Sequence, residues 1–182
     1  MTFPLFRLLT GVEIMGSVPK EGPLILASNH MSYLDPPLIG YTAFREVYFL
    51  AKPGLFSGSK CFAWLIKAYN AISIAGTEGL RIAVKLLKQG KAIVIFPEGT
   101  RSRRGVLLPF NPGMSYLAIS LNIPVVPVHI TNSNRKVLSL ILRINKLRIR
   151  FGNPIFPSGY EKTREGFDRF SLKVREEVDR LR

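Results

Sequence analysis

The sequence predicts an α/β domain in which helices flank a central sheet of mixed, largely parallel strands. Short apolar runs typical of buried strands alternate with longer segments of helical periodicity, which is the pattern of this fold class. The 15 glycines and 13 prolines among the 182 residues indicate many short elements joined by tight connections. A chain of this length is expected to form one domain around a continuous core.

The strands are expected where apolar residues cluster in short runs. LILAS (24–28) and AIVIF (92–96) are almost wholly apolar, as strands buried on both faces of a sheet are. LRIRFGNPI (147–155) instead alternates between apolar and polar residues, which also favours a strand. Weaker candidates of the buried type are EVYFLA (46–51), AISIA (71–75) and VVPVHI (125–130).

Helices are expected between and after these strands. The most regular is TEGLRIAVKLLKQG (77–90), whose apolar residues fall on one side, with Thr77 as a cap and Gly90 as a stop. A second helix is predicted over 112–121, where a proline near the start costs little because its missing amide proton has no helical partner there. The residues after Tyr160 predict a charged amphipathic helix that closes the domain.

The charge of the chain predicts an anionic partner, because its formal net charge is +14. No acidic residue stands between Glu98 and Glu161, so we expect this stretch to form a positive face for an anionic membrane surface. A solvated basic surface without a partner is the alternative. Nucleic acid is not expected, because no nucleic-acid motif is recognised and apolar loops are abundant. The basic residues of the stretch are Arg101, Arg103, Arg104, Arg135, Lys136, Arg143, Lys146, Arg148 and Arg150.

The compartment is predicted to be reducing, because Cys61 is the only cysteine and no intrachain disulfide can form. Neither a signal peptide nor a transmembrane helix is expected. Arg7 interrupts the apolar start of the chain, and prolines break the uncharged run 105–134. We therefore expect a cytoplasmic protein, bound peripherally to the inner face of the cell membrane.

The motif SNHMSYLDPP (28–37) places a histidine and a carboxylate after a predicted strand end, where ligands gather in α/β sheets. Asp35 can fix the tautomer of His30 and leave its other nitrogen to remove a proton. Five positions along a straight helix would place the two side chains about 140° apart, so the segment must bend, and Pro36 supplies a reason. The alternatives are a structural histidine bonded to the loop, Ser32 as a helix cap, and Asn29 as the residue that holds the turn.

A second motif, FPEGTRSRRG (96–105), follows the strand predicted over 92–96. Gly99 allows close approach of the backbone to a ligand, Thr100 offers a hydroxyl, and Arg101 offers a planar fork suited to phosphate. The alternative is a turn in which Glu98 and Arg101 pair with each other. A base loop and an anion loop together predict a reaction of two substrates at a shared cleft, in which a histidine activates a substrate hydroxyl. No GxSxG elbow and no metal-ligand spacing is present, which disfavours covalent and metal routes.

With these motifs the sequence resembles the glycerolipid acyltransferases, whose best-known members are the 1-acylglycerol-3-phosphate acyltransferases. NHMSYLD matches the histidine and aspartate motif of the family, FPEGTRSR its acceptor-binding block and IPVVPV (123–128) a later block. The resemblance implies an α/β fold like that of glycerol-3-phosphate acyltransferases and a single acyltransferase domain over 1–182. Its parts are an N-terminal segment (1–21), which is either interfacial or buried, a catalytic core (22–160) and a C-terminal helix (161–182).

The resemblance also implies roles for the motif residues. His30 would deprotonate the acceptor hydroxyl with support from Asp35. The acyl donor would be acyl-CoA or acyl carrier protein. The acceptor would be the sn-2 hydroxyl of 1-acylglycerol 3-phosphate, and the product would be phosphatidate. Neither a cofactor nor a metal is expected. The acceptor phosphate would be held by Glu98, Gly99, Thr100 and Arg101, with support from Asn29, Ser32, Pro97 and Arg103.

The sequence departs from the family at two basic positions. An arginine is common after the strand that here reads AISIA (71–75), and a lysine is common after the phenylalanine that is here Phe110. Arg81, Arg103 or Arg104 are candidates to replace them. The departures make another lysophospholipid or lipid alcohol an alternative acceptor. A non-catalytic protein that binds anionic lipid is a separate alternative, against which the intact His30 and Asp35 argue.

Two further interpretations concern residues outside the motifs. His129 is interpreted as structural rather than catalytic. The segment with Phe62, Trp64, Leu65 and Ile66 is interpreted as core, and an acyl-chain tunnel is the alternative that the family implies.

Overall fold

The computed structural model describes residues 11–51, 54, 70–73, 76–102, 105–135 and 145–182. Several sequence-based interpretations therefore concern residues outside this part of the chain. These are the apolar N-terminal start over 1–10, Cys61, the core or tunnel residues Phe62, Trp64, Leu65 and Ile66, and the basic residues Arg103, Arg104, Lys136 and Arg143.

The described residues form one mixed sheet with the strand order β1-β7-β6-β2-β5-β3-β4. The strands from β6 to β4 run parallel to one another, whereas β7 is antiparallel to β6 and parallel to β1. The prediction of a mixed, largely parallel sheet is therefore confirmed. The strands are β1 (Glu13–Met15), β2 (Leu24–Ser28), β3 (Val47–Ala51), β4 (Ala71–Ser73), β5 (Ala92–Ile95), β6 (Val125–Thr131) and β7 (Arg148–Phe151).

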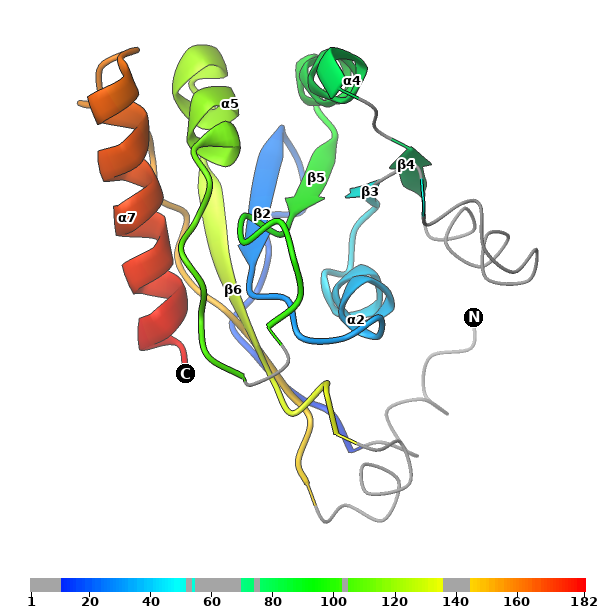
Figure 1. Ribbon diagram of the computed structural model, residues 1–182. Helices are drawn as coiled ribbons and strands as arrows, with labels where there is room; N and C mark the ends of the chain where they lie inside the picture. The colour runs from blue at the N-terminus through cyan, green and yellow to red at the C-terminus, as the bar shows by residue number, and fades with distance from the viewer. Residues whose placement is uncertain (1–10, 52–53, 55–69, 74–75, 103–104, 136–144) are drawn as a thin grey trace.

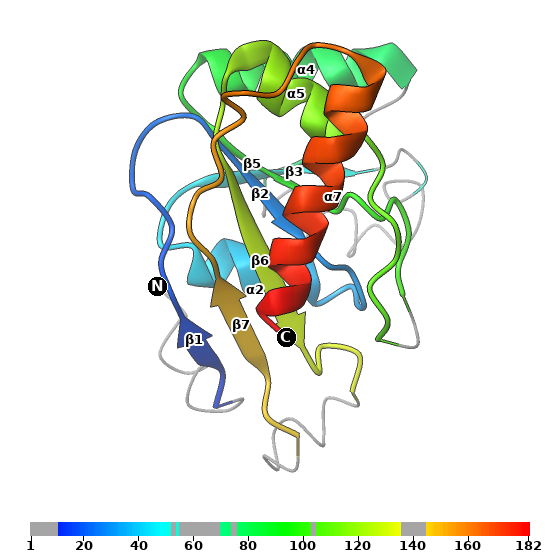
Figure 2. The ribbon, with the colours of Figure 1, turned by 90° about the vertical axis from the view of Figure 1, so that its left-hand side faces the viewer.

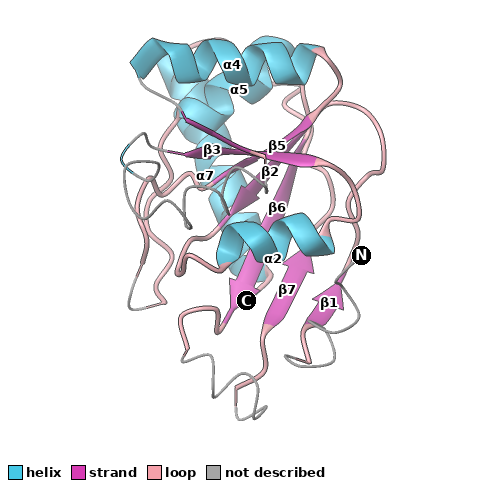
Figure 3. Cartoon of the chain, turned by 90° about the vertical axis from the view of Figure 1, so that its right-hand side faces the viewer, coloured by secondary structure: helices cyan, strands magenta, loops and turns pink. Residues whose placement is uncertain are grey.

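Helices cover both faces of this sheet, so the fold has three layers (Figure 1). Helices α5 (Gly113–Leu121) and α7 (Arg164–Arg180) lie on one face together with α4 (Gly76–Lys88), and α7 stands in front of the sheet in Figure 2. Helix α2 (Asp35–Thr42) covers the opposite face and stands in front of the sheet in Figure 3. The sheet thereby separates two apolar cores.

Strand β2 contributes to both cores, because successive side chains of a strand point to opposite faces. Leu24 and Leu26 pack into the core under α2, and Ile25 and Ala27 pack into the core under α4, α5 and α7. All four side chains are almost completely buried. The continuous apolar run of β2 is thus explained by burial on both faces, as the sequence predicts.

The predicted helices are present, with shifts of one to three residues at their ends; the C-terminal helix, predicted over 161–182, spans Arg164–Arg180. Helix α4 begins at Gly76, so Thr77 lies inside the helix and is not its cap. Gly90 follows its end with a φ of +76° and donates its N–H to Leu87, which confirms the predicted stop. Helix α5 begins one residue after Pro112, and Thr163 caps α7 by accepting a hydrogen bond from the N–H of Gly166.

Two elements were not predicted from the sequence. Strand β1 has only three residues and lies at the sheet edge, where Glu13 pairs with Arg148 of β7. Helix α2 has eight residues with two prolines in its first turn, and it begins without a side-chain cap. Its stability comes from burying Leu38 and Ile39 against the sheet rather than from local signals. None of the described helices combines the length and the apolar character needed to cross a bilayer.

Candidate active site

Two loops begin at the ends of neighbouring strands and contact each other. Strands β2 and β5 are parallel neighbours in which Ala27 is aligned with Ile95. Their loops, which begin at Asn29 and Phe96, therefore start side by side at the carboxyl edge of the sheet (Figure 1). We call them the base loop (29–34) and the anion loop (96–102).

The base loop brings His30 and Asp35 together. Nδ1 of His30 lies 2.7 Å from Oδ2 of Asp35, and the same oxygen accepts the N–H groups of Met31 and Ser32, each at 2.7 Å. The predicted bend is therefore confirmed, but its explanation differs. Asp35 is itself the first residue of α2, so the chain bends between His30 and Leu34 and not because Pro36 keeps Asp35 out of a helix.

The environment of His30 suits a general base. A carboxylate beside Nδ1 favours the tautomer that carries its proton there, which leaves Nε2 as an acceptor. The ring of Phe96 stacks on the imidazole with centroids 4.1 Å apart and 23° between the planes, and the histidine side chain remains 18% exposed. The imidazole is thus held in orientation while a substrate can still reach it.

Glu98 joins the two loops through backbone groups. Its Oε1 accepts the N–H of His30 at 2.8 Å, and its Oε2 accepts the N–H of Leu108 at 3.0 Å. The carboxylate is buried, and this burial raises the pKa of Glu98, although the two backbone donors act in the opposite direction. Since both oxygens face the backbone, the alternative turn pair of Glu98 with Arg101 is not formed among the described residues.

The His30 peptide is held from both sides. Its N–H is bound by Glu98, and its carbonyl accepts the N–H of Ser102 at 2.7 Å. The pairing of the two loops continues the register of their strands. In the strands, the aligned residues Ala27 and Ile95 are 68 positions apart. The same separation holds for the contacts of His30 with Glu98 and of Tyr33 with Arg101.

The anion loop has the backbone that its sequence predicts. Gly99 adopts a φ of +67°, and a Cβ at this position would lie 3.0 Å from Nδ2 of Asn111, so the backbone conformation and the close contact both favour glycine here. Thr100 is exposed. The Arg101 guanidinium pairs with no carboxylate in the described part of the chain; its carbon lies 3.7 Å from the ring centre of Tyr33, and it donates to the tyrosine hydroxyl at 3.0 Å.

The supporting residues act mainly on the backbone. The side-chain amide of Asn29 donates to the carbonyl of Ile130 at 2.9 Å and accepts its N–H at 2.7 Å, so it ties the base loop to β6. The carbonyl of Pro97 accepts both the N–H and the side chain of Asn111. The hydroxyl of Ser32 accepts the N–H of Leu34, whereas the N-cap of α2 is Leu34, so the interpretation of Ser32 as the cap is wrong. Arg103 lies outside the described residues.

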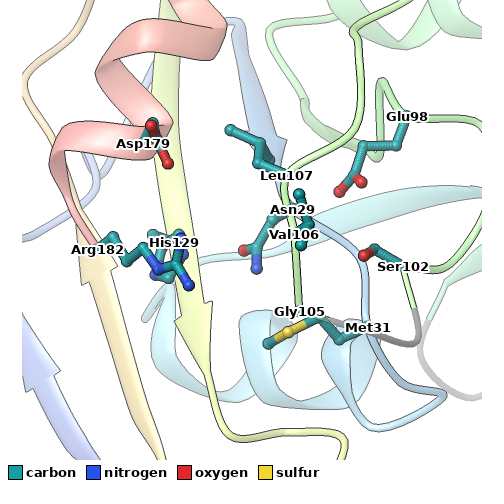
Figure 4. Close-up of a pocket in the computed structure, with 10 residues that line it drawn as sticks. All are labelled: Asn29, Met31, Glu98, Ser102, Gly105, Val106, Leu107, His129, Asp179 and Arg182. Carbon is teal, nitrogen blue, oxygen red and sulfur yellow. The ribbon is translucent and has the colours of Figure 1, made fainter.

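A small polar pocket lies behind the two loops and reaches the end of α7 (Figure 4). The segment that continues from the anion loop is fixed to α7, because Arg175 donates to the carbonyls of Leu107 and Leu108. The pocket is lined by Asn29, Met31, Glu98, Ser102, Gly105, Val106, Leu107, His129, Asp179 and Arg182.

His129 has the properties of a structural side chain. It is 8% exposed, and burial, with smaller contributions from Arg150 and Arg182, lowers its pKa to about 4. Its Nδ1 lies 3.3 Å from Oγ1 of Thr131. A neutral, buried imidazole with this partner supports the structural interpretation of His129.

The basic stretch is partly neutralised by the chain itself. Lys146 and Arg148 both pair with Glu13, and Arg150 donates to the carbonyls of Leu181 and Arg182. Lys146 and Arg148 therefore pair with the edge strand, and Arg150 joins β7 to the residues after α7, contacts that are not predictable from the sequence. In the described part of the chain, no three side chains of histidine, cysteine, aspartate or glutamate converge on a metal site.

Three residues that contribute to the site were missed in the sequence. Phe96 stacks on His30, Tyr33 stacks on Arg101, and Arg175 fixes the segment after the anion loop. Tyr33 could have been found by counting equal distances along the two loops. That count requires knowing that β2 and β5 are neighbours in register, which the sequence alone does not show.

Comparisons with known proteins point in one direction. A family model described as Acyltransferase matches residues 11–131. The chain is 30% identical over 143 residues to 1-acyl-sn-glycerol-3-phosphate acyltransferase of Borreliella burgdorferi, covering 74% of this chain and 57% of that protein. It is 26% identical over 168 residues to the chloroplastic 1-acyl-sn-glycerol-3-phosphate acyltransferase BAT2 of Brassica napus, covering 86% of this chain and 47% of that protein. The chain thus spans about half the length of these curated relatives.

A solved structure is similar across nearly the whole chain. The crystal structure of the 1-acyl-sn-glycerophosphate (LPA) acyltransferase PlsC from Thermotoga maritima superposes with a TM-score of 0.72 at 28% sequence identity. The match covers 93% of this chain and 71% of that chain. The similarity therefore includes both the sheet and the helices on its two faces.

Proposed function

The chain belongs to the acyltransferase family, and from this membership we propose that it acylates the sn-2 hydroxyl of 1-acylglycerol 3-phosphate to give phosphatidate. The acyl donor would be a thioester, either acyl-CoA or acyl carrier protein. The observation that carries the proposal is the contact of 2.7 Å between His30 and Asp35 at the end of β2. The acceptor is inferred from the similar proteins, which are 1-acyl-sn-glycerol-3-phosphate acyltransferases.

The proposed reaction is a direct transfer. Nε2 of His30 removes the proton of the acceptor hydroxyl as its oxygen attacks the thioester carbonyl, and the tetrahedral intermediate then expels the donor thiolate. The thiolate takes the proton from the imidazolium, so the products are an ester and a free thiol. The buried carboxylate of Asp35 stabilises the imidazolium that exists between these two proton transfers.

The acceptor phosphate is proposed to bind at the anion loop. The planar guanidinium of Arg101 suits two phosphate oxygens, and Gly99 permits close approach of the backbone. The hydroxyl of Thr100 would add a further donor. Glu98 contributes differently from what the resemblance implies, because a buried carboxylate bonded to two backbone N–H groups supports the loop and would repel a phosphate.

An assay of acyl transfer to three different acceptors tests the proposal. Thiol release from acyl-CoA, and then from acyl carrier protein, is measured with lysophosphatidate, glycerol 3-phosphate and lysophosphatidylcholine in turn. We expect transfer to lysophosphatidate, and we expect His30→Ala to lower kcat roughly 10²–10⁴-fold with the melting temperature retained. Near-normal turnover by His30→Ala would contradict the mechanism.

One observation favours a second class of acceptor. The position after Phe110 is Asn111, whose side chain bonds to the carbonyl of Pro97 and supplies no cation. Another lysophospholipid or lipid alcohol is therefore the second candidate. Transfer to lysophosphatidylcholine without transfer to lysophosphatidate would select it, and absence of transfer with every donor and acceptor would select a non-catalytic protein that binds anionic lipid.

Peripheral binding to an anionic membrane surface is proposed from the net charge of +14. Exposed cations are screened by salt, so binding to vesicles that contain phosphatidylglycerol should weaken as the salt concentration rises. Vesicles of phosphatidylcholine alone are the control. Binding that is indifferent to both salt and lipid charge would contradict this proposal and indicate apolar insertion.

A further inference from the structure

The two loops of the site are joined by a stacked pair of side chains. The Arg101 guanidinium carbon lies 3.7 Å from the ring centre of Tyr33, and its Nη2 donates to the tyrosine hydroxyl at 3.0 Å. Tyr33 lies in the base loop between His30 and Asp35, and Arg101 lies in the anion loop. The pair is therefore a direct side-chain link between the proposed base and the proposed phosphate site.

The stacking fixes the plane of the guanidinium. An arginine has five N–H donors, all in the plane of the group, so a ring that covers its face leaves most of them available at the edge. An unsupported arginine at a surface loop samples many rotamers, and ordering it on binding costs entropy. Tyr33 removes part of this cost in advance.

The composition of the site makes this ordering important. Arg101 is the one cation in the described loop segments 29–34, 96–102 and 105–112. Within these described segments a bound phosphate would meet one guanidinium, and the orientation of that group would decide whether it binds one or two phosphate oxygens.

We propose that Tyr33 is a positioning residue, which holds Arg101 so that it selects acceptors with an exposed phosphomonoester. The inference rests on the proposed function, because it names what orders the phosphate ligand of that reaction. Tyr33 is 51% exposed, so a large loss of stability is not expected when it is replaced.

The test compares Tyr33→Phe and Tyr33→Leu, each with and without Arg101→Ala. For Tyr33→Leu we expect the KM for lysophosphatidate to rise about tenfold while kcat and the KM for the acyl donor stay within about threefold. Tyr33→Phe keeps the stack and loses only the hydroxyl, so its KM should rise about threefold or less. In the Arg101→Ala background, Tyr33→Leu should add less than about twofold.

The matched control is Tyr116→Leu, which removes another exposed tyrosine, on α5 and outside the site. It should leave both KM values unchanged. A fall in kcat for Tyr33→Leu at an unchanged acceptor KM would overturn the inference. So would an effect of Tyr33→Leu that persists in full without Arg101, because the tyrosine would then act on something else.

A binding measurement separates this inference from the proposed function. If the wild-type protein transfers no acyl group to lysophosphatidate, the proposed function fails, and the inference is decided by thermal shift with glycerol 3-phosphate. The melting temperature of the wild type should rise, that of Tyr33→Leu should rise less, and that of Arg101→Ala should not change. Equal shifts in all three proteins, or no shift in the wild type, would overturn the inference.

Discussion

The carboxylate of Glu98 accepts the backbone N–H of His30 at 2.8 Å and the backbone N–H of Leu108 at 3.0 Å. One side chain therefore connects the peptide of the proposed base with the segment that follows the anion loop. The carbonyl of His30 is bound in turn by the N–H of Ser102. The position of the imidazole thus depends on the anion loop as well as on Asp35.

Glu98→Gln tests this connection. A glutamine side chain has one acceptor oxygen, so its amide N–H₂ must face the N–H of either His30 or Leu108, and one partly buried backbone donor loses its partner. Such a loss costs roughly 1–3 kcal/mol of stability. We expect a lower melting temperature and a fall of kcat of about tenfold or more, because misplacement of the base affects the chemical step. The measurement is steady-state kinetics. A higher KM for the acceptor at an unchanged kcat would instead indicate that Glu98 takes part in binding the acceptor phosphate.

Asp35→Asn separates the charge of Asp35 from its geometry. The amide oxygen can take the place of Oδ2 and still accept from His30, Met31 and Ser32. Its N–H₂ replaces Oδ1, which is buried and has no hydrogen-bond partner among the described residues. The tautomer of the histidine is then retained, and the negative charge that stabilises the imidazolium is lost. We expect kcat to fall by about 10²-fold.

Asp35→Ala serves as the comparison for this substitution. It removes the charge and all three hydrogen bonds, so its kcat should fall further than that of Asp35→Asn, and its melting temperature should also be lower. Equal kcat values for the two variants would show that the charge alone matters.

His129 predicts a loss of stability in mild acid. Burial lowers its pKa from 6.5 to about 4, so between these values the unfolded chain takes up a proton that the folded protein does not. The free energy of unfolding should therefore fall as the pH decreases from about 6.5 towards 4, by roughly 3 kcal/mol in total at about 1.4 kcal/mol per pKa unit.

The measurement is urea unfolding of the wild type and of His129→Gln between pH 4 and pH 7. Glutamine does not titrate, so the difference between the two proteins should shrink as the pH falls. The raised pKa of Glu98 acts with the opposite sign, since its contribution is lost as the pH rises, but it is present in both proteins and cancels. A difference that stays constant over this range would contradict the assignment of a neutral, buried His129.

The hydroxyls of Ser115 and Ser171 predict a coupled pair between α5 and α7. They lie 2.6 Å apart, and both residues are buried. Ser115→Ala or Ser171→Ala alone leaves one hydroxyl without its partner and should cost roughly 1–3 kcal/mol. The double variant should cost less than the sum of the two, and additive effects in chemical denaturation would show that the hydrogen bond contributes nothing.

Much of the fold was predictable because its signals are local. The apolar runs of β2 and β5 have no polar residue except Ser28, since both faces are covered, and α4 shows a clear apolar side with Gly90 at its end. Helix α2 gave no such signal, because its two prolines and short length resemble a turn and only its packing under the sheet makes it helical. Strand β1 is equally dependent on its partner β7.

The candidate site was predictable in part for a similar reason. His30, Asp35 and the glycine of the anion loop are marked by residue types whose chemistry or backbone freedom is specific. The partners of Glu98 were not predictable, because they are backbone groups of residues 68 and 10 positions away in the chain. Such contacts depend on strand order, and strand order is a property of the whole domain.

The equal separation of His30 from Glu98 and of Tyr33 from Arg101 has a consequence for changes in chain length. Inserting one residue between Ser28 and His30 would shift His30 and Tyr33 out of register with the anion loop, although no side chain of the site had been replaced. Inserting one residue in both loops, before His30 and before Glu98, would restore the pairing. The site should therefore accept many exchanges of side chains more readily than a single insertion or deletion, and its two loops are expected to change length only together.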